Sequence, residues 1–237
     1  AAIRTGCTLA SALHIPMGFF STHDPPILDV APTLSRMLHG LGWPFWGPLF
    51  WLGKRASRLV AGRWYQLRDE IGLAPSADGN PLVDSHSPLL VLALFSRLLA
   101  DKQPDWPAQT IVTGFPFYDD PEADLPPTLE RFLDSGTAPI VFTLGSAVSR
   151  TGGSFFQNSL ACVKLLNRRA VLVVGTGNGG KLPALPGEVM AVEYAPYAKL
   201  FPRASVVVHH GGVGTTGLAM RSGRPMLVVP FAWDQPD

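Results

Sequence analysis

The stretch that decides the fold runs from Val206 to Pro236 and reads VVVHHGGVGTTGLAMRSGRPMLVVPFAWDQP. It opens with a continuous β-branched run, passes through a glycine-rich turn and a helix-like segment at residues 215–222, and returns to an apolar run at residues 226–229. Strands that are apolar along their whole length and alternate with helices are typical of a parallel sheet covered on both faces. The stretch therefore predicts an α/β fold.

The same alternation continues upstream. We expect strands at residues 140–144, 171–174 and 189–193 and a helix at residues 154–167. Together with the opening stretch they predict a doubly wound domain at residues 139–237, incomplete at its C-terminus. Before it, prolines crowd residues 114–138, which we interpret as an interdomain linker.

Residues 1–113 are predicted to be part of an N-terminal domain. We expect the end of a helix at residues 1–13 and a strand at residues 17–20. Residues 31–72 are expected to be mainly helical with an interruption near residues 43–48, and strands are expected at residues 87–95 and 110–113. The chain has no initiator Met and stops just after a strand-like run, so we expect an internal part of a longer protein.

Composition narrows the function classes. Among 237 residues, 19 Lys plus Arg balance 18 Asp plus Glu, so no nucleic-acid partner is expected, and the near-neutral, apolar chain permits loose membrane association. Cys7 and Cys162 are too far apart in sequence for a metal knuckle or a redox pair. They fit buried thiols in a cytoplasmic protein.

Two glycine loops suggest cofactors that the surrounding residues do not favour. Residues 175–182, GTGNGGKL, match the P-loop spacing, but Leu182 stands where Ser or Thr would bind magnesium, and Pro183 blocks the helix. Residues 212–217 match GxGxxG, yet they do not form the first βα turn of their domain, and Asp234 follows only after another strand. For residues 175–182, a surface turn is favoured over a nucleoside triphosphate site. For residues 212–217, a dinucleotide cofactor remains the lesser alternative.

A third interpretation takes the loop from His210 to Thr216 as an anion site. Successive small residues leave several backbone N–H groups free to converge on an anion, and a helix starting near Thr215 adds the positive end of its dipole. His210 can donate a hydrogen bond, or a charge if protonated, while the Thr215 and Thr216 hydroxyls can cap the helix or reach phosphate oxygens. Adjacent histidines point to opposite sides of a strand, so one of the pair is expected to be structural. The loop predicts a phosphate or diphosphate ligand.

These residues resemble a known signature. His210 to Thr216, then Gly223-Arg224-Pro225 and Asp234-Gln235-Pro236, resemble the donor-binding signature of bacterial UDP-glycosyltransferases related to macrolide, glycopeptide and sterol glycosyltransferases. The segments at residues 143–146, TLGS, and 194–197, YAPY, are similar to further family motifs. The resemblance covers residues 110–237 and implies the GT-B fold, with two Rossmann-like domains.

The resemblance also implies a reaction. It points to an inverting, metal-independent transfer of a hexosyl group from a nucleoside-diphosphate sugar, a UDP- or TDP-sugar, to a hydroxyl of a lipophilic small molecule, without a cofactor. The family's general-base His lies upstream of this chain, so no catalytic residue is assigned, and the chain alone is expected to be inactive. The implied donor-binding residues are Ser146, Tyr194, Tyr197, His210, Gly211, Gly212, Gly214, Thr215, Thr216, Asp234 and Gln235.

The resemblance assigns roles within this set. Tyr194 would stack on the nucleobase with Tyr197 at its border, the loop from His210 to Thr216 with Ser146 would hold the diphosphate, and Asp234 and Gln235 would bind the sugar. Leu218 stands where many relatives have a ribose-binding Glu. Two alternatives stay open: a non-catalytic module that binds a nucleotide sugar or a lipid, and a nucleotide-sugar epimerase of the same fold.

Overall fold

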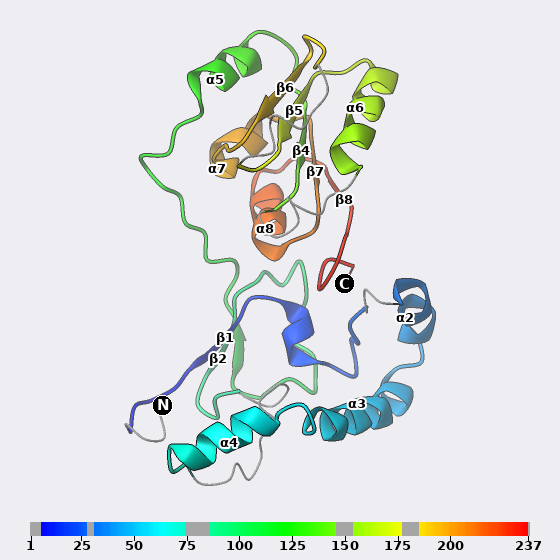
Figure 1. The fold of residues 1–237 in the computed structure, drawn as a ribbon, viewed down its shortest axis with the longest axis vertical. Helices are drawn as coiled ribbons and strands as arrows, with labels where there is room; N and C mark the ends of the chain where they lie inside the picture. Colours follow the sequence, from blue (N-terminus) through cyan, green and yellow to red (C-terminus); the bar gives the residue numbers. More distant parts are fainter. Residues whose placement is uncertain (1–5, 28–30, 74–85, 146–153, 177–184, 237) are drawn as a thin grey trace. The chain divides into compact units, whose positions relative to one another are not determined.

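A computed structural model describes residues 6–27, 31–73, 86–145, 154–176 and 185–236. The chain forms two compact units that divide between Pro116 and Phe117 (Figure 1). Within the described residues, no helix combines the length and the apolar character that a membrane span requires.

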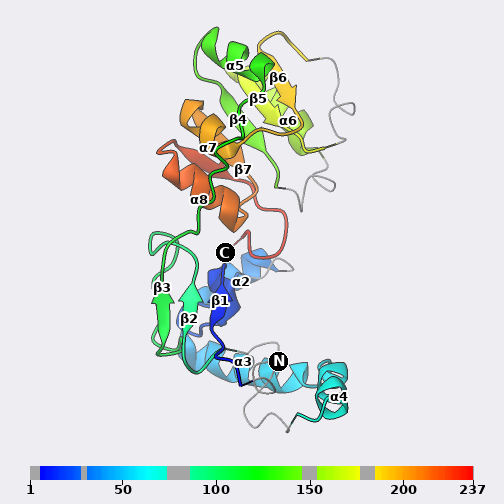
Figure 2. The same ribbon diagram turned by 90° about the vertical axis from the view of Figure 1, so that its left-hand side faces the viewer.

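The first unit contains a three-stranded parallel sheet with strand order β1-β2-β3 (Figure 2). Its strands are β1 (Ser11–Leu13), β2 (Val91–Ala93) and β3 (Thr110–Val112). Between β1 and β2 lie η1 (Pro16–Phe19), α2 (Pro32–His39), α3 (Trp43–Ser57) and α4 (Gly62–Glu70). The predicted helical region is confirmed, but the interruption expected near residues 43–48 was wrong: the helices are separated at residues 40–42 and 58–61, and α3 continues through Pro48.

The expectations for the first residues of this unit were wrong. Residues 11–13 form a strand rather than the end of a helix, because they pair with β2 about 80 positions downstream. Residues 16–19 form a 3-10 helix rather than a strand, since Pro16 begins it with a fixed φ and Phe20, at φ +48°, ends it.

The second unit is built on a five-stranded parallel sheet with strand order β6-β5-β4-β7-β8. Its strands are β4 (Ile140–Thr143), β5 (Ala170–Val173), β6 (Val189–Val192), β7 (Val206–His209) and β8 (Met226–Val228). The connecting helices are α5 (Pro127–Asp134), α6 (Phe155–Leu166), α7 (Tyr197–Leu200), η3 (Phe201–Arg203) and α8 (Val213–Arg221). The predicted doubly wound arrangement is confirmed.

Alternate strand residues supply two apolar layers. On one face, Val141 and Val207 pack in a cluster with side chains of α5, α7 and α8. On the other face, Phe142 and Leu172 pack with Phe155 and neighbours on α6. Figure 1 shows α6 on the opposite side of this sheet from α5 and α7. Both faces of the sheet are therefore covered, as continuous apolar strands require.

The strand order reverses at β4. From β4, the sheet continues through β5 and β6 on one side and through β7 and β8 on the other. In an open parallel sheet, such a reversal leaves a crevice beyond the carboxyl ends of the two strands that diverge, and ligands bind there. The segments that follow Thr143 and His209 thus lie where a ligand site is expected.

The predicted linker contains core residues. Leu129 and Leu133, on α5, belong to the apolar cluster of the second unit. Near the start of this unit, Asp119 accepts two hydrogen bonds from the Arg221 guanidinium, at 2.7 and 2.9 Å, and Arg221 also lies over the Phe117 ring. The limits of the interdomain linker at residues 114–138 stay a prediction. From residue 117 onward, most of this segment belongs to the second unit.

Both cysteines are exposed, so the expectation of buried thiols was wrong. On α6, the buried side chains include Phe155, Ser159 and Val163, which repeat at one helical face. Cys162 falls outside that stripe. The cytoplasmic location that was inferred from buried thiols stays a prediction.

Candidate functional site

His210 and Gly145 meet at the reversal point of the sheet. His210 directly follows β7, and Gly145 lies two residues beyond β4. The Gly145 N–H donates a hydrogen bond to Nδ1 of His210, with 3.0 Å between the nitrogens. A Cβ atom at Gly145 would lie 2.4 Å from Cε1 of His210, and one at Gly212 would lie 2.4 Å from its Nε2. The imidazole is therefore held between two positions that only glycine can occupy.

This hydrogen bond also fixes the tautomer of His210. Because Nδ1 accepts from a backbone N–H, the proton of the neutral ring resides on Nε2. Burial lowers the pKa of His210 from its usual value, and the nearby Asp234 carboxylate partly opposes that change. His210 is thus a neutral hydrogen-bond donor through Nε2, and not the cation that was considered from the sequence.

The start of α8 presents backbone donors that the helix itself does not use. Gly212 is the N-cap residue, and its carbonyl accepts from both the N–H and the hydroxyl of Thr216, at 2.9 and 3.1 Å. The N–H groups of Val213, Gly214 and Thr215 precede this first bond of the helix and have no intrahelical acceptor. A helix N-terminus with such groups favours an anion. The Thr216 hydroxyl, however, is used inside the helix.

Gly211 contributes a bend rather than a donor. Its φ is +95°, and its N–H donates to Nδ1 of His209 at 3.1 Å. A Cβ atom there would lie 2.9 Å from Val228 Cγ1 and 3.2 Å from the Gln235 carbonyl oxygen. Glycine is required because the backbone is left-handed and closely packed at this position.

The Asp234–Gln235 segment lies beside the glycine loop. The buried Gln235 side chain accepts, through Oε1, the N–H groups of Phe231 and Ala232 at 2.9 and 3.1 Å. The side-chain oxygen of Gln235 therefore stabilises the turn at residues 231–235. Asp234 acts on His210 electrostatically. The structure thus brings His210, the glycine loop and Asp234 into one place.

The two predicted base-binding tyrosines differ. Tyr194 is 66% exposed, so its ring is accessible. The Tyr197 hydroxyl is hydrogen-bonded to Oγ1 of Thr143 at 2.6 Å, its ring stacks on Phe201 at 4.6 Å, and burial raises its pKa. Tyr197 thus has partners within the unit. Leu218 packs against the apolar cluster.

Some predicted positions lie outside the described residues. These are Ser146 and residues 177–182, which make up most of the glycine loop with P-loop spacing. Conversely, the sequence did not single out two residues that the structure places at the site. Gly145 could have been found from its position beside Ser146 in the TLGS motif, whereas the hydrogen bond of His209 to the loop has no signal in the sequence.

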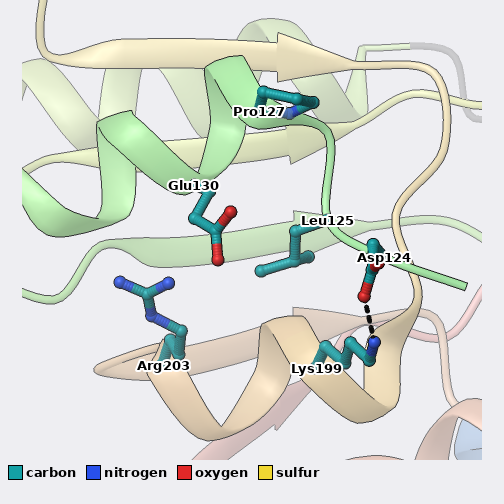
Figure 3. Close-up of a pocket in the computed structure, with 6 residues that line it drawn as sticks. All are labelled: Asp124, Leu125, Pro127, Glu130, Lys199 and Arg203. Atoms are coloured by element: carbon teal, nitrogen blue, oxygen red, sulfur yellow. Dashed lines mark hydrogen bonds and ion pairs between the residues drawn. The ribbon is translucent and has the colours of Figure 1, made fainter.

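Another hollow of the second unit lies away from these residues. It has a volume of about 560 Å³ and is lined by Asp124, Leu125, Pro127, Glu130, Lys199 and Arg203 (Figure 3). Lys199 forms an ion pair with Asp124, and Arg203 forms one with Asp134. These ion pairs join α5 and the segment before it to α7 and η3. Because both cations are already paired with carboxylates of the same unit, the hollow is not an anion site.

Comparisons with known proteins show what this chain is similar to. Residues 158–236 match the family described as erythromycin biosynthesis protein CIII-like, C-terminal domain. The chain is 38% identical over 201 residues to O-mycaminosyltylonolide 6-deoxyallosyltransferase of Streptomyces fradiae, covering 80% of this chain and 46% of that protein. It is 29% identical over 235 residues to a sterol 3-beta-glucosyltransferase of Arabidopsis thaliana, covering 96% of this chain and 36% of the relative.

A solved structure agrees in fold. The glycotransferase of kitacinnamycin superposes with a TM-score of 0.57 at 26% identity, over 73% of this chain and 44% of that chain. The predicted resemblance to bacterial glycosyltransferases and the predicted GT-B fold are confirmed. The chain spans less than half the length of these relatives.

Proposed function

We propose that this chain, which resembles the bacterial glycosyltransferases of the GT-B fold, is the part of such an enzyme that binds a nucleoside-diphosphate sugar. The enzyme would transfer a hexosyl group from a UDP- or TDP-sugar to a hydroxyl of a lipophilic small molecule. The observation that carries the proposal is the neutral His210, fixed by Gly145 at the reversal point of the sheet and next to the N-terminal N–H groups of α8.

This arrangement suits a departing diphosphate. In an inverting transfer, the acceptor oxygen attacks the anomeric carbon while the bond from that carbon to the diphosphate oxygen breaks. Negative charge then develops on the leaving group, where Nε2–H of His210 and the N–H groups of Val213, Gly214 and Thr215 can donate hydrogen bonds. Donors that are already oriented stabilise such charge without reorganisation. Their number and direction support a metal-independent reaction.

The rest of the donor would extend from this point. Asp234 is close enough to influence His210 and is the proposed partner of the sugar hydroxyls, while exposed Tyr194 is the proposed platform for the nucleobase. Tyr197 would support the site from within through Thr143. With Leu218 packed in the core, ribose hydroxyls would need another partner.

The proposed acceptor is lipophilic. The relatives' names denote sugar transfer to O-mycaminosyltylonolide and to a sterol. In the first unit, α3 exposes Trp43, Phe45 and Trp51, which supports an apolar partner of that unit. Loose membrane association stays an open prediction for the same surface.

Nucleotide titration tests the donor site. Gly145→Ala would force the His210 ring out of place. We therefore expect the affinity for UDP and dTDP, measured by calorimetry, to weaken at least about tenfold, which corresponds to the loss of one charge-assisted hydrogen bond. Gly187→Ala is the matched control, because a Cβ atom at Gly187 meets nothing within 4 Å. Equal affinity in both variants would reject the site, and tighter binding of NAD than of either diphosphate would favour a dinucleotide cofactor.

Product analysis of the whole enzyme, of which this chain is the proposed donor-binding part, separates the remaining functions. A transferase releases the nucleoside diphosphate only when an acceptor is glycosylated, whereas an epimerase converts the donor sugar without an acceptor. A binding module does neither while still binding UDP or dTDP.

A further inference from the structure

His209 is a buried polar residue for which the proposed reaction has no task. It is the last residue of β7, and its register partners are Thr143 on β4 and Val228 on β8. Its side chain is 0% exposed. Among the described residues, Nε2 of His209 has no hydrogen-bond partner. An apolar side chain would avoid this unpaired group, so packing alone does not explain a histidine here.

The other ring nitrogen contacts the glycine loop. Nδ1 of His209 accepts the Gly211 N–H at 3.1 Å, which places the ring proton on the unpaired Nε2. The backbone of the same residue holds the neighbouring strand, since the His209 carbonyl accepts the N–H of Val229 at 2.8 Å. His209 therefore joins the end of the sheet to the first residue of the bend.

Gly211 is restrained from the opposite side as well. Its left-handed backbone, at φ +95°, lies against Val228 and the Gln235 carbonyl, which leave no space for a Cβ atom. The bend at Gly211 separates His210, whose ring is held by Gly145, from Gly212, whose carbonyl accepts the first bond of α8. Any rotation at Gly211 changes the direction of His210 relative to the N–H groups of α8.

We propose that His209 is a positioning residue of the diphosphate site, which acts by holding the Gly211 N–H and thereby fixing the bend between His210 and the N-terminus of α8. The inference rests on the proposed function, because the ligand of that bend is the diphosphate. His209 itself does not contact the ligand.

Two substitutions test this role. His209→Leu keeps an apolar core side chain but removes the acceptor, whereas the Oδ1 atom of Asn in His209→Asn can replace Nδ1. In calorimetry, we expect His209→Leu to weaken UDP binding at least about fivefold, which corresponds to the loss of one hydrogen bond. The affinity for UMP should change less, because UMP has no β-phosphate. His209→Asn should recover most of the affinity.

The thermal unfolding midpoint provides the control for a merely structural role. We expect His209→Leu to unfold at a temperature close to that of the wild type, because removal of the unpaired buried Nε2–H offsets the loss of the hydrogen bond from the Gly211 N–H. If instead the midpoint and the affinities for UDP and UMP fall together, and Asn restores neither, the positioning role is overturned.

Amide hydrogen exchange in the ligand-free protein gives a second, independent decision. The Gly211 N–H should exchange slowly in the wild type and in His209→Asn, and faster in His209→Leu. Equal exchange rates in the wild type and in His209→Leu would overturn the proposal. Failure of the wild type to bind UDP or dTDP would instead reject the proposed function, while the exchange rates would still decide whether His209 holds Gly211.

Discussion

Two adjacent histidines have different environments because successive side chains of a strand point to opposite faces. His210 turns toward the loop after β4, and His209 turns toward the apolar cluster that α8 covers. Each ring accepts a backbone N–H at Nδ1 and is therefore neutral. At this scale, single glycines decide the geometry, since side chains at residues 145, 211 and 212 would collide with their neighbours.

The burial of His209 predicts a dependence of stability on pH. Burial, and secondarily the neighbouring His210, lowers the pKa of His209 from 6.5 to about 4. Between these values, the unfolded chain binds more protons than the folded chain, so stability rises with pH across this window and is lost as pH falls from 6.5 toward 4. The full difference corresponds to about 3 kcal/mol.

Urea denaturation between pH 4 and pH 7 measures this effect. We expect the free energy of unfolding of the second unit to fall toward pH 4 in the wild type and to fall less steeply in His209→Leu. Identical pH profiles in the two proteins would show that His209 titrates normally.

At the scale of elements, α5 changes the interpretation of the segment before β4. Proline-rich sequence predicted a linker, yet Pro126 and Pro127 stand at the N-cap and first position of a helix, where proline is well tolerated. Leu129 and Leu133 then face the sheet one helical turn apart. The Arg169 side chain donates to the carbonyls of Phe132 and Thr137, which ties the end of α5 to β5.

Substitution on α5 tests whether it belongs to the core. Leu129 is fully buried, so Leu129→Ala should lower the free energy of unfolding of the second unit by about 2 to 5 kcal/mol through lost burial and a residual cavity. Glu130→Ala, one position along and exposed, is the matched control and should change it by less than about 0.5 kcal/mol. Comparable effects of the two substitutions in chemical denaturation would contradict the assignment of α5 to the core.

At the scale of the whole molecule, the chain is two compact units joined through an extended segment. Residues 113–120 have no helix or strand, and Tyr118 is 82% exposed. A protease needs an accessible, extended segment, which helices and paired strands do not offer.

Limited chymotrypsin digestion tests this organisation. We expect the first cleavage after Tyr118, with two resistant fragments identified by mass spectrometry, because Arg221 covers the ring of Phe117. Exposed aromatic residues on α3 should be cut more slowly, because they lie within a helix. Tyr118→Ser should suppress the first cut. An initial cut within residues 186–236 would contradict two units of this extent.

Much of the second unit could be predicted from local sequence. Its strands and the helices α6 and α8 were placed to within about two residues, because continuous β-branched runs and helical periodicity are local signals. In the first unit, the strands predicted at residues 110–113 and 87–95 are confirmed as β3 and as the shorter β2, whereas β1 was missed. The three residues of β1 carry no periodicity of their own and become a strand only through β2.

The sequence by itself determined the parallel α/β sheet and the glycine-rich turn into a helix after β7, for which it predicts an anion, because hydrophobic pattern, glycine spacing and helix start are written in consecutive residues. Only the tertiary structure decided which donors remain available. It paired Gly145 with His210 across 65 positions, used the Gly211 N–H on His209, and engaged Tyr197 with Thr143. The bonds of Gly145 and Tyr197 join segments far apart in the sequence, so they depend on which strands become neighbours, and packing of the whole sheet settles that. The bond between Gly211 and His209 is local, yet it needs the left-handed bend that Val228 and Gln235 enclose.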